Sequence, residues 1–309
     1  MLINISLKLK LFLFLLGLAT FGCQSSSSES ITSDSKETKV VKEQKAFENG
    51  KIVSLSGFIS EVLYDLGLEQ QIIARDVTST YPESLATLPN LGHVSQLNTE
   101  AIIALQPDVI IIEQAQLGQF KQYEQLRKSD ISIITVPSSH SLSNAVHAAE
   151  YLKQYLSIDK QEIADLKAQI IADSMKLESQ LASISEKAKV LFIYARGTGR
   201  LMVAGSNTSA AAIIEKAGAL NAISSFESFK PLSPEALIEA SPDIILMFRS
   251  GLESLDGKQG LAQIVGIPQT PAYQNNRIIA MDGHYLTAFG PRASKAALEL
   301  FSQIYIDPL

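Results

Sequence analysis

The most informative stretch of the sequence reads Glu100-Ala-Ile-Ile-Ala-Leu-Gln-Pro-Asp-Val-Ile-Ile111. A second stretch, Glu235-Ala-Leu-Ile-Glu-Ala-Ser-Pro-Asp-Ile-Ile-Leu246, aligns with it without a gap. Each copy has the pattern of a helix that ends at Pro-Asp and leads into an apolar strand, which is a common junction in α/β proteins. Two such junctions, one in each half of the chain, indicate two duplicated α/β lobes related by approximate symmetry.

The two copies differ in what precedes them. A looser match pairs a helical segment ending at Gly67 with another ending at Gly218. Between this segment and the repeat, the first lobe has about 16 more residues than the second. The additional residues include Thr78-Ser-Thr-Tyr-Pro-Glu83. An insertion in only one lobe of a symmetric scaffold is a natural place for a lobe-specific function.

The rest of the body alternates short apolar strands with amphipathic helices. Strands that are apolar on both faces are typical of parallel sheets buried between helices. We expect strands at residues 52–55, 72–75, 109–113, 131–136, 189–195, 244–248 and 278–281. We expect the intervening helices at residues 57–66, 98–105, 119–128, 208–217, 234–240 and 292–305.

The alternation is interrupted near the middle of the chain. Residues 141–157 and 160–186 both have helical periodicity, and neither glycine nor proline interrupts the second segment, which would be about 40 Å long. The pattern predicts an α/β fold of two Rossmann-like lobes with parallel sheets joined by one long interdomain helix. The expected boundaries are an N-terminal lobe at residues 51–158, a linking helix at 159–187 and a C-terminal lobe at 188–309.

The composition is that of a globular protein with a sizeable core. Of 309 residues, 46% are hydrophobic and 19% are charged, and the formal net charge is −6. This acidic balance argues against a nucleic-acid partner, because nucleic-acid-binding proteins usually carry basic patches.

The N-terminus has the features of an export signal. Two lysines precede the apolar run at residues 11–22, which is too short to span a membrane and suits a signal peptide. The only cysteine, Cys23, follows this run and resembles the lipidated cysteine of a bacterial lipobox, although Thr20 stands where leucine is usual. The alternative is a plain secretory signal with an unmodified cysteine. Residues 1–23 are therefore expected to be a lipoprotein signal peptide ending at its lipobox cysteine, and the polar residues 24–50 a flexible tether.

Two α/β lobes joined by one long helix, behind a lipoprotein signal, resemble the class III substrate-binding proteins of bacterial ABC importers, which bind haem, cobalamin and ferric siderophores. Within this class, five strings are similar to periplasmic haem-binding proteins of haem uptake systems: Thr78–Glu83, Lys230–Leu237, Gly251–Leu255, Met281–Gly283 and Phe289–Arg292. The resemblance extends roughly from Lys51 to Tyr305. It implies a binding protein that is not an enzyme.

The resemblance assigns the haem-iron axial ligand to Tyr81. In open α/β lobes, ligands bind beyond the carboxyl ends of strands, and Tyr81 follows the strand expected at residues 72–75. Tyrosine is an established haem ligand, and a nearby guanidinium would favour its phenolate form. The alternative is a turn tyrosine that packs locally.

The second lobe is expected to supply the other wall of the cleft. Arg196 and Arg200 lie in a glycine-containing loop after a strand, and Arg249, the preferred candidate, directly follows the strand expected at 244–248. These arginines would meet a propionate or the phenolate; the alternative is that each is a solvated surface charge. Some relatives have a ligating histidine in the loop of Arg196, and its absence argues against a two-haem arrangement.

Four histidines are further candidates for the site. His284, which is followed by Tyr285, is the preferred sixth ligand or distal contact, and His93 lies in the insertion and would flank the ligand. His140 lies in a loop, and His147 is expected to be structural or exposed. Their spacing matches no zinc motif.

Glu100 and Glu235 occupy equivalent positions of the repeat. Each is expected in the first turn of a helix, where Asn98 or Thr99 would cap the first helix and Ser233 the second. In the class that this chain resembles, one glutamate per lobe docks onto a two-fold permease, which implies that role here. The alternative is that each acid only stabilises its helix dipole.

These features together predict a monomeric, lipid-anchored protein in the periplasm or at the cell surface. It would capture haem between its lobes with little hinge motion and deliver it to an ABC permease and its ATPase subunits. Two alternatives remain: cobalamin or a ferric siderophore on the same scaffold, since cobalamin binders also place a tyrosine in such a loop, and a haem-modifying enzyme.

Overall fold

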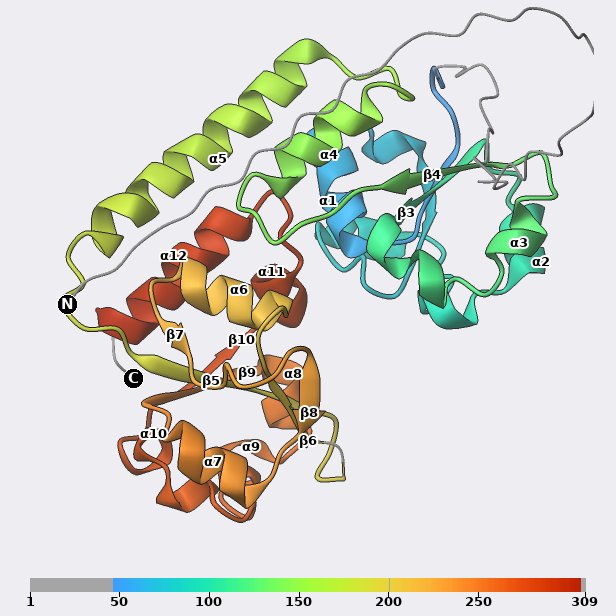
Figure 1. The fold of residues 1–309 in the computed structure, drawn as a ribbon. Coiled ribbons are helices and arrows are strands. Elements are labelled where there is room, and N and C mark those ends of the chain that lie inside the picture. The colour runs from blue at the N-terminus through green and yellow to red at the C-terminus, as the bar shows by residue number, and fades with distance from the viewer. Residues whose placement is uncertain (1–46, 200, 307–309) are drawn as a thin grey trace, which may run out of the picture. The chain divides into compact units, whose positions relative to one another are not determined.

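The computed structural model describes residues 47–199 and 201–306 of the chain. The expected signal peptide with Cys23, most of the tether, and Arg200 lie outside the described residues. Figure 1 shows the described part as two sets of strands and helices connected through α5. In this part of the chain, no helix is both long and apolar enough to cross a membrane.

The first lobe, defined here as β1 to α4, contains a four-stranded sheet with the order β2-β1-β3-β4, and all of its pairings are parallel. Its elements are β1 Ile52–Ser54, α1 Gly57–Asp65, η1 Glu69–Gln71, β2 Ile72–Arg75, η2 Glu83–Thr87, η3 Val94–Gln96, α2 Thr99–Ala104, β3 Val109–Glu113, η4 Gln114–Gln119, α3 Tyr123–Leu126, β4 Ser132–Val136 and α4 Asn144–Leu152.

The second lobe, β5 to α12, contains a six-stranded sheet with the order β10-β9-β5-β6-β8, and β7 pairs with β5. Its elements are β5 Lys189–Ala195, β6 Leu201–Ala204, α6 Ser209–Lys216, β7 Leu220–Asn221, β8 Phe229–Pro231, α7 Pro234–Ala240, β9 Ile244–Phe248, α8 Arg249–Glu253, α9 Gly257–Leu261, η5 Ile267–Gln269, α10 Pro271–Gln274, β10 Ile278–Met281, α11 Gly283–Thr287 and α12 Ala293–Tyr305.

The predicted fold class, two α/β lobes built on parallel sheets, is confirmed. Three strands of the second sheet, β6, β7 and β8, were not expected from the sequence. Of these, β6 and β8 pair antiparallel, although β5, β7, β9 and β10 pair parallel. The chain reverses through the turn that contains Gly197, where φ is positive, so that β6 returns alongside β5.

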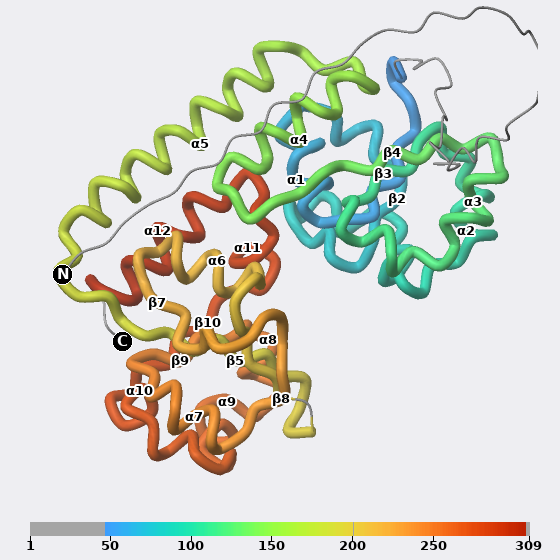
Figure 2. Tube along the Cα trace, in the orientation of Figure 1, coloured from blue at the N-terminus to red at the C-terminus, as the bar shows by residue number. Residues whose placement is uncertain are grey.

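A single helix, α5 (Lys160–Leu181), runs between the lobes (Figure 2). Its 22 residues give a length of about 33 Å, and it ends five residues before the helical pattern in the sequence does. Ile163 and Ile170 pack in the core of the first lobe, whereas Leu177 packs in the core of the second. Because α5 belongs to both hydrophobic cores, the lobes cannot separate far without exposing part of one core.

The two copies of the repeat have the same local structure. In each, a short helix ends in a residue with positive φ, Gln106 in the first copy and Ser241 in the second. The aspartate that follows then ties down the first strand of its own lobe. Oδ2 of Asp108 accepts a hydrogen bond from Lys51 N at 2.7 Å, and Oδ2 of Asp243 accepts one from Lys189 N at 2.8 Å. The helix–strand junction predicted from the sequence is therefore present in both lobes.

The shared aspartate gives a symmetric stability prediction. Asp108→Ala and Asp243→Ala should each lower the free energy of unfolding by about 1 kcal/mol, because each leaves the backbone N–H at the start of a strand without its charged acceptor. Urea denaturation followed by circular dichroism measures the change. Glu253→Ala, which removes an exposed carboxylate from α8, is the control. If only one of the two variants had a lower free energy of unfolding, the two junctions would not be equivalent.

Candidate ligand-binding site

The buried carboxylate of Asp76 holds the loop that carries Tyr81. Asp76 directly follows β2, and its oxygens accept hydrogen bonds from Thr78 Oγ1 at 2.7 Å and from Ser79 N and Oγ at 3.1 and 2.7 Å. Thr78 Oγ1 in turn accepts one from Gly57 N at 2.9 Å, at the start of α1. These hydrogen bonds attach the loop to the carboxyl end of β2 and to α1. In open α/β lobes, ligands bind beyond the carboxyl ends of the strands, so the loop lies where a ligand is expected.

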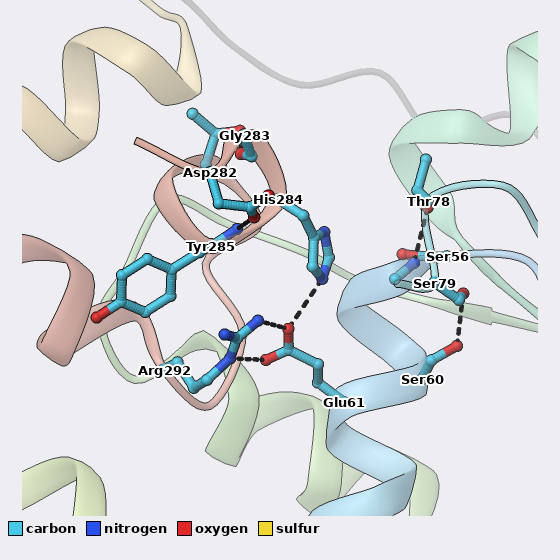
Figure 3. Close-up of polar contacts among 12 residues, drawn as sticks. Ser56, Ser60, Glu61, Thr78, Ser79, Asp282, Gly283, His284, Tyr285 and Arg292 are labelled. Atoms are coloured by element: carbon cyan, nitrogen blue, oxygen red, sulfur yellow. Dashed lines mark hydrogen bonds and ion pairs between the residues drawn. The ribbon is translucent and has the colours of Figure 1, made fainter. Parts of the chain in front are cut away.

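A second set of hydroxyl groups continues this network into the lobe. Ser60 Oγ lies 2.7 Å from Ser79 Oγ (Figure 3). It also donates to Ser54 Oγ at 2.8 Å. All three serines are fully buried. Buried hydroxyls are retained when they are hydrogen-bonded to one another, so this cluster fixes the backbone up to Ser79. Tyr81, two residues further on, is 42% exposed.

Gly57 is the point where three segments meet. A Cβ atom placed there would lie 2.4 Å from Thr78 O and 2.4 Å from Cε1 of His284. The absence of a side chain at this position therefore allows the Tyr81 loop, α1 and α11 of the second lobe to approach one another closely.

Arg292, just before α12, lies between Tyr81 and Glu61. Its guanidinium carbon is 3.6 Å from the centre of the Tyr81 ring and 4.9 Å from that of Tyr285. Its Nε donates to Oε2 of Glu61 at 3.0 Å, and its Nη2 donates to Oε1. One cation of the second lobe thus makes a bidentate ion pair with α1 and a cation–π contact with the tyrosine loop, both in the first lobe.

Glu61 also faces a second basic group of the other lobe. His284 Nε2 lies 3.0 Å from Oε1 of Glu61, within ion-pair range but not aligned as a hydrogen bond. The Glu61 side chain is only 4% exposed. Burial by itself raises the pKa of this carboxyl, but His284 and Arg292 outweigh that effect and lower it. We call Glu61, His284 and Arg292 the inter-lobe clasp (Figure 3).

A cavity of about 500 Å³ lies next to the clasp, between the lobes. Glu113 and His140 line it from the first lobe, and His284 and Phe289 line it from the second. The rings of His140 and Phe289 are 5.2 Å apart. Tyr81 does not line this cavity, whereas Thr78 of the same loop does.

Glu113 is a titratable residue in the wall of the cavity. It ends β3 and accepts a hydrogen bond from Ser56 Oγ. Burial raises the pKa of Glu113, and the negative charge of Asp76 adds to that rise, although the hydrogen bonds from Ser56 and Ser138 oppose it. The side chain therefore favours its neutral form more than an exposed glutamate does, which lowers the cost of placing an apolar ligand beside it.

The structure brings together only some of the residues singled out in the sequence. Tyr81 and Tyr285 flank Arg292, and His284 reaches the clasp. His93 is exposed, and its Nδ1 lies 2.9 Å from Ser95 Oγ in a local turn.

The expected arginines lie elsewhere on the second lobe. Arg196 is exposed over the ring of Tyr194, 5.7 Å from its centre. Arg249 is exposed because α8 begins there directly after β9. Among the described arginines, it is Arg292, not the preferred Arg249, that lies on the Tyr81 ring. Glu100 and Glu235 are both exposed on their helices, α2 and α7.

Sequence reasoning missed the clasp and the acidic wall of the cavity. Arg292 stood in a string noted for its resemblance but received no role. The sequence did contain a signal for Glu61, because it is the only acid in the largely apolar segment Gly57–Leu63. In the structure, every residue of this segment is buried. A charge in such a segment requires a partner from elsewhere in the fold. Glu113 and His140 had no comparable signal.

Comparisons with known proteins agree with this architecture. A model of the family described as periplasmic binding protein matches residues 52–285. The apo structure of the periplasmic haem-binding protein RhuT from Roseiflexus sp. RS-1 superposes with a TM-score of 0.76 at 35% identity, covering 83% of this chain and 98% of that one. The uncharacterised ABC transporter substrate-binding lipoprotein YvrC of Bacillus subtilis is 26% identical over 84% of this chain and 81% of its own length. The vitamin B12-binding protein of Vibrio campbellii is 25% identical over 82% and 90%, respectively.

The inter-lobe clasp should be strongly coupled energetically. Glu61→Ala should lower the free energy of unfolding by about 2–4 kcal/mol, because it leaves Arg292 partly buried without its carboxylate. In a double-mutant cycle, adding Arg292→Ala should cost much less than it does in the wild-type protein. Additive losses, measured by chemical denaturation, would contradict the pairing.

Asp65, one turn after Glu61 on α1, makes stability depend on pH. Burial raises the pKa of Asp65 to about 6, and the charge of Glu61 contributes to the rise. Folding therefore favours protonated Asp65. The stabilisation is complete below its unfolded pKa of about 3.9 and is lost as the pH rises through the folded value.

Asp65→Asn should consequently raise the melting temperature at about pH 7.5 by roughly 2–4 °C, after allowance for solvent screening. The difference from wild type should vanish near pH 4, where Asp65 is protonated in the folded protein. Glu215→Gln, which neutralises an exposed acid on α6, is the matched control. Thermal denaturation at several pH values tests this, and a gain independent of pH would contradict it.

Proposed function

The chain belongs to the periplasmic binding protein family, and we propose that the ligand it delivers to an ABC importer is haem. The family is one of binding proteins, so the proposed activity is capture and delivery without turnover. The observation that carries the proposal is Tyr81, a half-exposed phenol at the carboxyl end of β2 with a guanidinium on its ring.

Tyr81 is the proposed axial ligand of the haem iron. Ferric iron favours an anionic oxygen, and tyrosine serves as such a ligand in haem proteins. Arg292 places a positive charge over the ring, where it would attract the anionic oxygen of a tyrosine bound to iron. The similarity to a solved haem-binding protein at 35% identity supports the same ligand class. The Asp76 network supplies the rigidity that a ligating loop needs.

The clasp suggests how capture and release are linked. Arg292 is shared between Glu61 and Tyr81. A phenolate bound to iron attracts Arg292 more strongly than a neutral phenol does, so ligand binding would strengthen the contact between this cation and the tyrosine loop. Separation of the lobes by a transporter removes Arg292 from Tyr81, because Arg292 belongs to the other lobe. The phenolate then loses its neighbouring charge, and iron is released more easily.

Delivery requires a partner and a location outside the cytoplasm. The family and the lipoprotein relative indicate an extracytoplasmic protein of an ABC importer, which implies a permease and its ATPase subunits. We propose that Glu100 and Glu235 dock on the two permease subunits. We further propose that Cys23 carries the lipid anchor and that the protein acts as a monomer.

Cobalamin is the second candidate ligand. The similarity to a vitamin B12-binding protein over most of both chains favours it. The inter-lobe cavity is lined by hydroxyl, amide, histidine and carboxyl side chains together with apolar ones such as Phe58 and Phe289, and within the described residues no arginine lines it.

Haemin titration of the purified protein tests the proposal. We expect a saturable shift of the Soret band at a single equivalent. Tyr81→Phe should weaken binding about ten-fold or more, because it removes the ligating oxygen and costs at least about 1.4 kcal/mol. Tyr64→Phe is the control. It removes the exposed phenol of a different tyrosine, on α1, and should bind haemin as the wild type does.

Parallel titration with cyanocobalamin separates the two candidates. Binding of cyanocobalamin without binding of haemin would replace haem as the ligand. Haemin binding that is unchanged in Tyr81→Phe would keep haem but remove Tyr81 as its ligand. Formation of a haem-derived product in the presence of a reductant would contradict a pure binding role.

A further inference from the structure

Two large aliphatic side chains are exposed at equivalent positions of the repeat. Ile103 on α2 is 44% exposed, and Ile238 on α7 is 73% exposed. The gapless alignment of the two copies pairs these residues with each other. The residue before each isoleucine, Ile102 or Leu237, is buried in the core of its lobe. Each helix therefore turns one aliphatic side chain inward and the next one outward.

Each exposed isoleucine is next to a glutamate. Ile103 follows Glu100 by three residues, and Ile238 follows Glu235 by the same interval. Residues three apart on a helix are neighbours on its surface, with Cβ atoms about 5–6 Å apart. Equivalent caps hold both first turns: Asn98 Oδ1 accepts from Ala101 N at 3.1 Å, and Ser233 Oγ accepts from Ala236 N at 3.2 Å.

Folding gives no reason for these isoleucines. A β-branched residue has a lower helix propensity than alanine, glutamate or lysine. An exposed aliphatic side chain also forgoes most of the stabilisation that burial would bring. Single exposed apolar residues are common on proteins, but here both lobes carry the same carboxylate–aliphatic pair at the same repeat positions. The shared feature points to a shared partner.

We propose that Ile103 and Ile238 are paired apolar anchors for the permease dimer. Each permease subunit would present a basic side chain to Glu100 or Glu235 and, next to it, an apolar depression for the isoleucine. The inference rests on the docking role proposed above for the two glutamates, but it does not depend on which ligand is carried. A partner with two identical subunits fits because it offers the same pair of contacts twice.

The two halves of the contact differ in their response to salt. Attraction between exposed charges is screened as ionic strength rises, whereas burial of an aliphatic side chain is not. In the wild-type protein, binding should therefore survive moderate salt through the isoleucines. Without them, the remaining binding depends on the glutamates and should fall more steeply with salt.

The test measures binding of the full-length protein to the purified permease–ATPase complex of its importer in lipid nanodiscs. Ile103→Ser and Ile238→Ser should each weaken binding about ten-fold, and the double variant about one hundred-fold, with a steeper salt dependence. Ile171→Ser is the matched control, since it removes an aliphatic side chain that is 48% exposed on α5. Haemin and cyanocobalamin titrations of each variant show that its ligand site is intact.

Each outcome decides the inference. Wild-type binding by the double isoleucine variant, together with loss of binding in Glu100→Ala and Glu235→Ala, would overturn the apolar anchors and leave the docking glutamates. Wild-type binding by both the isoleucine and the glutamate variants would overturn the docking role itself. An equal loss in Ile171→Ser would also overturn the inference. Failure of haem binding alone would overturn the proposed ligand and leave the docking result standing.

Discussion

The structure depends on one ion pair, between Glu61 of the first lobe and Arg292 of the second. A carboxylate as buried as Glu61 is costly unless a cation compensates it, and here the cation comes from the opposite lobe. Arg292 also lies on the ring of Tyr81. The contact between the lobes and the chemistry of the candidate ligand are therefore linked through one guanidinium, and neither can change without affecting the other.

Two other features make this arrangement effective. The Asp76 network holds the loop before Tyr81 in a fixed position, so the ring has a defined place relative to α1. The helix α5 packs in both cores, so the lobes are held near each other even without ligand. A small displacement is then sufficient to separate Arg292 from Tyr81, in keeping with the limited hinge motion expected for a single connecting helix.

Much of this organisation follows from the sequence, because it rests on local patterns. Apolar runs and the repeat predicted the four strands of the first sheet and β5, β9 and β10 of the second, and the insertion identified the loop of Tyr81. The clasp did not follow, because Glu61 and Arg292 are 231 positions apart and meet only when the lobes pack. Arg249 was favoured by the strand-end rule, but α8 begins at that residue and leaves it exposed. The antiparallel strands β6 and β8 also depend on a reversal of the chain, which the hydrophobic periodicity of the sequence does not predict.

The helix α5 has a consequence beyond its connecting role. Because α5 packs in the core of each lobe, its length sets the distance between the two copies of the repeat. Each residue added to a helix lengthens it by about 1.5 Å and rotates everything beyond it by about 100°. An insertion or deletion in α5 would therefore alter the spacing and facing of the two lobes together. The length of α5 is therefore constrained by any partner surface that both lobes contact at the same time.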